Sequence, residues 1–164
     1  GIHAAAAYKE PIVQKAIHAL KYQQVSVLAA PLAQLLSAYT GAWPFLFSRA
    51  TLFIPVPLHE KKLRDRGYNQ AHLLTAHFVL AYGGVCGCWL LERTRHTKQQ
   101  VDCTRDERLE NVRGAFRYAG PPRSVWPRVM LVDDVATTGA TLEACAFALR
   151  DAGARDIWGF VLVR

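Results

Sequence analysis

The stretch that decides the fold is Val129-Met130-Leu131-Val132-Asp133-Asp134-Val135-Ala136-Thr137-Thr138-Gly139-Ala140-Thr141. It opens on a continuous apolar run over residues 129–132, which is typical of a strand buried on both faces of a parallel sheet. Apolar residues at helical spacing follow over 142–149, and residues 157–163 form another apolar run. Strand, helix and strand at this spacing predict a right-handed α/β unit with a mostly parallel central sheet flanked by helices.

The loop between strand and helix has the chemistry of an anion site. Open α/β sheets bind ligands at the carboxyl ends of their strands. Backbone N–H groups at a helix start converge on negative charge, and Thr137, Thr138 and Thr141 add hydroxyl donors. Gly139 gives the backbone the freedom for close approach. We expect a phosphate group here.

Asp133 and Asp134 would repel a phosphate alone, but carboxylates accept hydrogen bonds from sugar hydroxyls and favour Mg²⁺ nearby. A sugar phosphate with a vicinal diol satisfies both halves of the stretch. Neither the Lys of a Walker A loop nor the G-x-G-x-x-G spacing of a dinucleotide site is present. The structural alternative is an acidic strand end followed by a capped helix.

The remaining chain predicts one domain over residues 1–164. Helical spacing over 12–20 and 28–39 predicts a helical N-terminal part within residues 1–45. Further along, we expect strands over 51–56, 89–91 and 115–118, and a helix over 73–81 that ends at Gly83. Residues 57–69 and 93–110 are polar or charged and are expected to be loops.

Composition limits the class of protein. Hydrophobic residues make up 51% and charged residues 20% of the 164, which is ordinary for a globular domain and unlike a disordered chain. Twenty Lys and Arg against 13 Asp and Glu give a net charge of +7, which suits an anionic partner. With no long apolar run and no signal-peptide pattern, we expect a cytoplasmic protein without membrane insertion.

Cysteine and histidine spacings predict no metal site built from protein ligands alone. The four cysteines match neither a zinc-ligand pattern nor a disulfide framework, so we expect reduced structural thiols. His77 falls on the apolar face of its predicted helix, and a core histidine is expected there. His59 lies in the charged loop and is the histidine of most functional interest.

Residues 129–141 resemble the phosphoribosyl-pyrophosphate (PRPP) motif of type I phosphoribosyltransferases. Other stretches resemble the ComF (GntX-like) family of competence-associated proteins: Ala19-Leu20-Lys21-Tyr22, Ile54-Pro55-Val56-Pro57-Leu58-His59, Arg64-Asp65-Arg66-Gly67-Tyr68-Asn69-Gln70-Ala71, Thr97-Lys98-Gln99-Gln100 and Arg108-Leu109-Glu110-Asn111-Val112-Arg113-Gly114-Ala115-Phe116. Together these stretches span nearly the whole chain. The resemblance implies a type I phosphoribosyltransferase-like fold.

The resemblance also implies roles for individual residues. Asp133 and Asp134 would bind the ribose of PRPP and its Mg²⁺, and residues 136–141 would bind the 5′-phosphate, as the following set: Ala136, Thr137, Thr138, Gly139, Ala140 and Thr141. Residues 57–69 correspond to the pyrophosphate loop, with Arg66, Gly67 and Arg64 as contacts. Residues 93–111 correspond to a closing catalytic loop, whose candidates are Arg95, Lys98, Gln100 and Arg108. A surface turn capped by Asn69 and a solvated loop are the structural alternatives.

The resemblance implies Mg²⁺-dependent phosphoribosyl transfer from PRPP to an unknown acceptor, in DNA uptake during natural transformation. The alternative is a non-catalytic accessory protein that binds PRPP or single-stranded DNA beside helicase-type partners. The chain departs from the family at Cys103, where a Leu is common, and has no counterpart of the family's N-terminal four-cysteine zinc module. Because it also lacks an initial Met, we expect that module upstream of residue 1.

Overall fold

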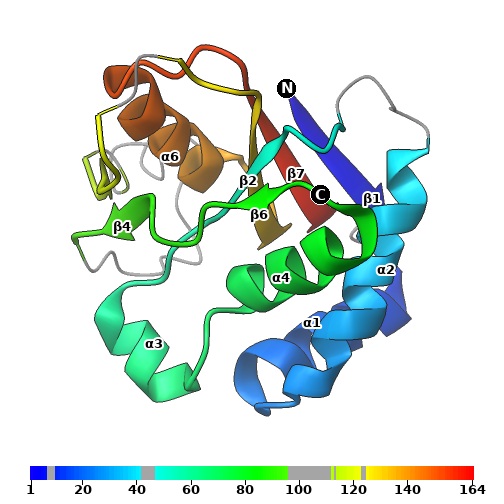
Figure 1. The fold of residues 1–164 in the computed structure, drawn as a ribbon. Coiled ribbons are helices and arrows are strands. Elements are labelled where there is room, and N and C mark those ends of the chain that lie inside the picture. Colours follow the sequence, from blue (N-terminus) through cyan, green and yellow to red (C-terminus); the bar gives the residue numbers. More distant parts are fainter. Residues whose placement is uncertain (7–9, 42–46, 96–111, 113, 123–124) are drawn as a thin grey trace.

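The computed structural model describes residues 1–6, 10–41, 47–95, 112, 114–122 and 125–164. Its centre is a five-stranded sheet in the order β1-β7-β6-β2-β3, in which every neighbouring pair is parallel (Figure 1). The strands are β1 (Ile2–Ala6), β2 (Leu52–Pro55), β3 (Val85–Cys86), β6 (Val129–Val135) and β7 (Ile157–Val163). The predicted parallel α/β sheet is therefore confirmed, and it has the arrangement of a type I phosphoribosyltransferase-like fold.

Helices cover both faces of the sheet, which is why its central strands are apolar on both sides (Figure 1). On one face, Val129 and Leu131 pack with α6 (Ala140–Asp151) and with an antiparallel pair, β4 (Leu91–Arg93) and β5 (Phe116–Tyr118). On the other face, Met130 and Val132 pack with α1 (Pro11–Tyr22), α2 (Ala29–Thr40) and α4 (Gln70–Tyr82). A short 3-10 turn, Ser26–Leu28, precedes α2.

The strand order places a topological switch point between β2 and β6. From β2 the chain proceeds to β3 on one side, whereas from β6 it proceeds to β7 on the other. Ligands of open α/β sheets bind outside the carboxyl ends of the strands at such a point. The ends of β2 and β6 lead into α3 (Glu60–Arg66) and into the 136–139 loop, respectively. The topology alone therefore predicts a ligand site at these two connections.

Several predictions for local structure need correction. Residues 1–45 contain α1 and α2, but they begin with strand β1, which the sequence prediction missed. Part of the expected charged loop is helix α3, because His59 caps its start by accepting from the Lys61 amide at 3.2 Å. His77 is exposed rather than in the core, and Ile12 is 77% exposed. The short strand expected at 89–91 forms two residues later, as β4.

Among the residues that the structure describes, no helix combines the length and the apolar character that crossing a bilayer requires.

Candidate functional site

The two acids lie within β6, not after it as the sequence suggested. Alternation along the strand puts Asp133 on the face of Leu131, toward α6, and Asp134 on the face of Val132, toward α1. The Asp134 amide donates to Asp133 Oδ1 at 2.9 Å, which fixes the position of that carboxylate. The carboxylates are therefore neighbours in sequence that face different surroundings.

Asp134 is held by a lysine from the first helix. Lys21 Nζ lies 3.0 Å from Asp134 Oδ2, and the two side chains are only 19% and 3% exposed. A buried charge of this kind needs a partner because it has lost its water. Sequence reasoning gave Lys21 no role, although the Ala19–Tyr22 stretch that contains it was one of the family-like stretches.

Among the carboxyls in the part of the chain that the structure describes, Asp133 has the most strongly shifted pKa. Burial and, second to it, the negative charge of Asp134 together raise its pKa to about 8, while the charge of Lys21 opposes both effects. The amide hydrogen bond from Asp134 also favours the ionised form, without reversing the shift. Without a ligand the shift therefore favours the protonated carboxyl, and a cation bound beside it would favour the carboxylate.

Two cations interact with this strand end and two more lie near them, and we call the four the cation cluster: Lys21, Arg93, Lys62 and Arg66. Burial lowers the pKa of Lys62, and the charges of Arg93, Arg66 and Lys21 lower it further. Burial also lowers the pKa of Arg93, opposed by the charges of Cys145 and Asp133. Neighbouring cations repel one another, so an anion bound among them would be stabilised.

The cluster draws on separate parts of the chain. Arg66 is positioned by two contacts: its guanidinium lies 5.6 Å from the centre of the Tyr22 ring, and Nη1 donates to Gln70 Oε1. The Tyr68 hydroxyl donates to the Leu20 carbonyl at 2.6 Å. The family-like stretches at 19–22 and 64–71 therefore lie against each other, which joins α1 to the end of α3.

The other predicted pyrophosphate contacts lie differently. Gly67 ends α3 in the left-handed region at φ 83°, and its amide donates to the Leu63 carbonyl at 2.8 Å. Arg64 is 72% exposed, with Nη1 3.6 Å from Glu60 Oε2. Asn69 caps α4 through Oδ1, which accepts from the Ala71 amide at 2.9 Å. The turn capped by Asn69, which was the structural alternative, is thus present. Arg66 nevertheless belongs to the cation cluster.

The 136–141 loop has the form expected of a helix start near an anion. The Ala136 amide donates to the Val163 carbonyl at 3.0 Å, which fixes the loop to β7. Gly139 has φ 82°, and a Cβ on it would lie 2.9 Å from Ile2 Cδ1, so a larger residue is disfavoured. Thr137 is exposed, while Thr138 and Thr141 are half-buried at the start of α6. Ala140 contributes the first helical amide, which approaches Thr138 Oγ1 at 3.4 Å.

The ends of the predicted closing loop are brought together. β4 pairs with β5, and the Thr94 amide donates to the Ala115 carbonyl at 2.9 Å. Arg93, at the end of β4, belongs to the cation cluster, and Arg95 is exposed. Lys98, Gln100 and Arg108 lie outside the described residues.

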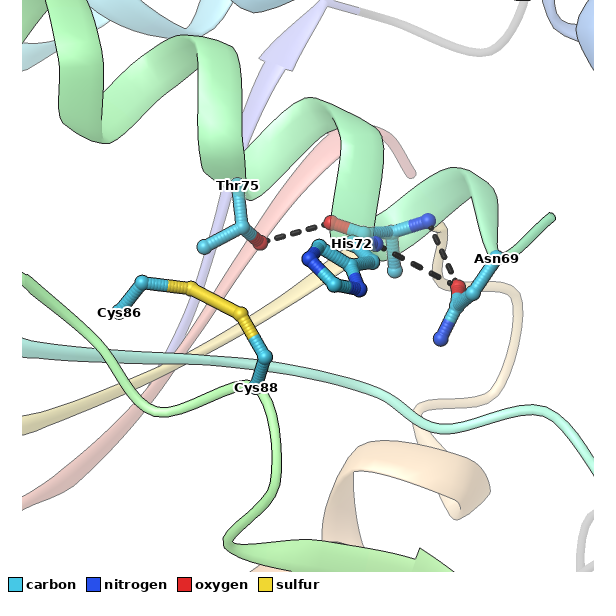
Figure 2. Close-up of a disulfide and its surroundings, with 6 residues drawn as sticks. Asn69, His72, Thr75, Cys86 and Cys88 are labelled. Atoms are coloured by element: carbon cyan, nitrogen blue, oxygen red, sulfur yellow. Dashed lines mark hydrogen bonds between the residues drawn. A yellow bond between two sulfur atoms is a disulfide. The ribbon is translucent and has the colours of Figure 1, made fainter.

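The expectation of reduced thiols is wrong for two cysteines. Cys86 and Cys88 form a disulfide with their Cα atoms 5.7 Å apart (Figure 2). A lone Cys-x-Cys pair does not reveal this bond in the sequence, because zinc and disulfide-framework patterns need more cysteines. Cys145 is free and buried, while Cys103 lies outside the described residues.

Comparison with individual known proteins identifies the family, although no family model matches the chain. Competence protein F of Haemophilus influenzae is 36% identical over 117 residues, covering 65% of this chain and 48% of that protein. Competence protein ComFC of Streptococcus pneumoniae is 32% identical, over 68% of this chain and 47% of that protein. The chain thus spans about half the length of these two relatives.

DNA utilization protein YhgH of Salmonella typhi is 30% identical over 161 residues, which cover 94% of this chain and 68% of that protein. The similarity therefore includes α1, α3 and β6, whose side chains meet at the strand end. The chain belongs to the ComF family of competence-associated proteins.

Proposed function

We propose that the chain binds PRPP with Mg²⁺ at the switch point between β2 and β6 and transfers its phosphoribosyl group during DNA uptake. The observation that carries the proposal is the cation cluster beside the Asp133–Asp134 pair. A ligand that carries both phosphates and a diol fits this arrangement, because the phosphates pair with the cations and the hydroxyls donate to the carboxylates. The names of the relatives, competence protein and DNA utilization protein, support the biological role.

Each part of the site would bind a different part of PRPP. Asp133 would accept from the ribose hydroxyls, while residues 136–141 would donate backbone N–H groups to the 5′-phosphate. Lys62, Arg66 and Arg93 would bind the pyrophosphate and offset its charge as it departs from C1′. Asp134 would act indirectly, because its partner is Lys21.

The carboxyl-rich strand end fits a magnesium ion. Carboxylate oxygens are ligands that Mg²⁺ prefers, and the ionised form of Asp133, which burial and the charge of Asp134 disfavour, would be stabilised by a cation. When bound with PRPP, Mg²⁺ would neutralise charge on the leaving pyrophosphate. Asp133 is the residue that would hold it.

Calorimetry with PRPP and Mg²⁺ tests the binding site. We expect Asp133→Asn to weaken binding at least tenfold, since one hydrogen bond to a charged group contributes about 1.5–3 kcal/mol. Asp151→Asn, at the exposed end of α6, is the matched control and should bind like the wild type. Equal affinity of all three proteins would rule out the site. Pyrophosphate release with a panel of acceptors then separates transfer from binding alone.

The net charge of +7 favours a second candidate, an accessory protein that binds single-stranded DNA. Phosphate contacts release counterions, so the DNA affinity would fall steeply as salt rises. A slope near zero in a plot of log affinity against log salt would exclude this candidate. DNA binding together with no pyrophosphate release from any acceptor would favour it over catalysis.

A further inference from the structure

A cavity of about 350 Å³ lies beside the disulfide, on the α3 side of β2. Its walls are Pro57 and Leu58 after β2, Leu63 of α3, the Tyr68–Asn69 connection, and the start of α4 at His72 and Leu73. Cys88 completes the lining, so one residue of the disulfide borders this space. Figure 2 shows the disulfide beneath the helix that carries His72 and Thr75.

Chain stabilisation does not account for this disulfide. Cys86 and Cys88 are two residues apart, and closing so short a loop removes little entropy from the unfolded chain. The backbone is already fixed there, because the Val85 amide donates to Thr51 O at 3.0 Å and the Gly87 amide to Phe53 O at 2.8 Å. Both cysteines therefore keep their places whether or not the sulfurs are joined.

The residue between the cysteines is also fixed by packing. Gly87 is buried, and a Cβ there would lie 2.7 Å from Leu90 Cδ1. Both flanking cysteines are only half-buried. A rigid, accessible Cys-x-Cys pair is suited to opening and closing in place.

We propose that Cys86–Cys88 is a thiol-exchange site, with Cys88 as the sulfur attacked by a low-molecular-weight thiol that enters the cavity. The incoming thiolate forms a bond to Cys88 Sγ, the Cys86–Cys88 bond breaks, and Cys86 Sγ leaves with the electron pair as a thiolate. A second thiolate then attacks the sulfur of the added group. It releases a small-molecule disulfide and leaves the protein as a dithiol.

The mixed disulfide has a consequence for the neighbouring site, and this part rests on the proposed function. The added group would occupy the cavity against Leu63, on the same short helix that carries Lys62 and Arg66 of the cation cluster. Displacing α3 would move those cations away from Lys21 and Arg93. The thiolated protein should therefore bind pyrophosphate more weakly than the disulfide form.

Peptide mapping by mass spectrometry tests the exchange with excess reduced glutathione as the probe. In folded protein quenched with acid before the second attack, we expect glutathione on Cys88, Cys86 as a free thiol, and Cys145 unreacted until unfolding. Cys86→Ser leaves Cys88 without its partner and should accept glutathione from glutathione disulfide. A disulfide that resists excess thiol in the folded protein, or an adduct on Cys86 instead, would overturn the proposal.

Filling the cavity provides the matched test. Leu63→Trp places a large ring at the cavity wall and should slow the reaction severalfold, whereas Leu80→Trp, on the exposed side of α4, should not. Equal rates for both would contradict entry through the cavity. Calorimetry with pyrophosphate then compares the disulfide and thiolated forms. If neither form binds pyrophosphate, the proposed function fails while the mapped adduct stands; equal binding by both removes only the regulatory consequence.

Discussion

At the scale of single residues, Asp133 makes the stability of the fold depend on pH. Its folded pKa is about 8 against an ordinary 3.8, so the folded state binds the proton more tightly than the unfolded state. The stabilisation is complete below the unfolded pKa and is lost as pH rises toward the folded one. We expect the free energy of unfolding of the ligand-free protein to fall over that window.

Urea unfolding across this pH range checks the expectation. Asp133→Asn should flatten the slope, because an amide does not titrate. Asp151→Asn, which is exposed on α6, should keep the wild-type slope. A wild-type slope retained in Asp133→Asn would assign the pH dependence to other groups.

The candidate residues differ in how far the sequence could place them. Residues 133–141 were identifiable because strand, acids and loop follow one another along the chain. Lys21, Lys62 and Arg93 reach the strand end through tertiary packing, which no local spacing encodes. Sequence reasoning selected Arg64 and Arg66 together, yet a helix directs residues two positions apart to different sides.

At the scale of elements, the start of α6 depends on its contact with β1. Gly139 and Gly67 have nearly the same backbone, at φ 82° and 83°, but a Cβ at Gly139 meets Ile2 Cδ1 at 2.9 Å while one at Gly67 meets nothing within 4 Å. Gly67→Ala should therefore cost only the left-handed conformation, about 1–2 kcal/mol. Gly139→Ala should cost more, because Ile2 must also shift.

Urea titrations of both variants measure this difference. Adding Ile2→Ala should recover part of the loss in Gly139→Ala and none in Gly67→Ala. An equal loss of unfolding free energy in the two glycine variants would show that the contact between Ile2 and residue 139 does not affect stability.

The elements missed by sequence reasoning share a cause. β1 reads Ile-His-Ala-Ala-Ala, with little of the β-branched or aromatic content that marks strands, and it forms because β7 offers a parallel partner. α3 has seven residues, six of them charged, and shows no apolar stripe. Strands β6 and β7 and helix α6 were predictable because their burial imposes continuous or periodic apolar runs.

At the scale of the whole molecule, the cation cluster opposes folding until an anion occupies it. Lys62 is half-buried near Arg93, Arg66 and Lys21, so Lys62→Gln should raise the melting temperature of the ligand-free protein. The same variant should gain less from pyrophosphate, because stabilisation by a ligand follows its affinity for the folded state.

Thermal unfolding with and without pyrophosphate checks both effects. Lys61→Gln, one residue earlier and exposed, is the control and should leave both temperatures near those of the wild type. An unchanged pyrophosphate shift in Lys62→Gln would remove Lys62 from the anion site.

The pairing of β1 with β7 also sets the order in which the molecule can be completed during synthesis. Ile2 pairs with Gly159, and Ala6 with Val163, so β1 leaves the ribosome long before β7, its neighbour in the described sheet. Until β7 emerges, β6 lacks one of its two neighbours as well. Such distant pairing slows folding and leaves strand edges open to other chains. A nascent chain arrested before β7 should therefore depend on chaperones, and the emergence of β7 is the step that joins β1 to the sheet.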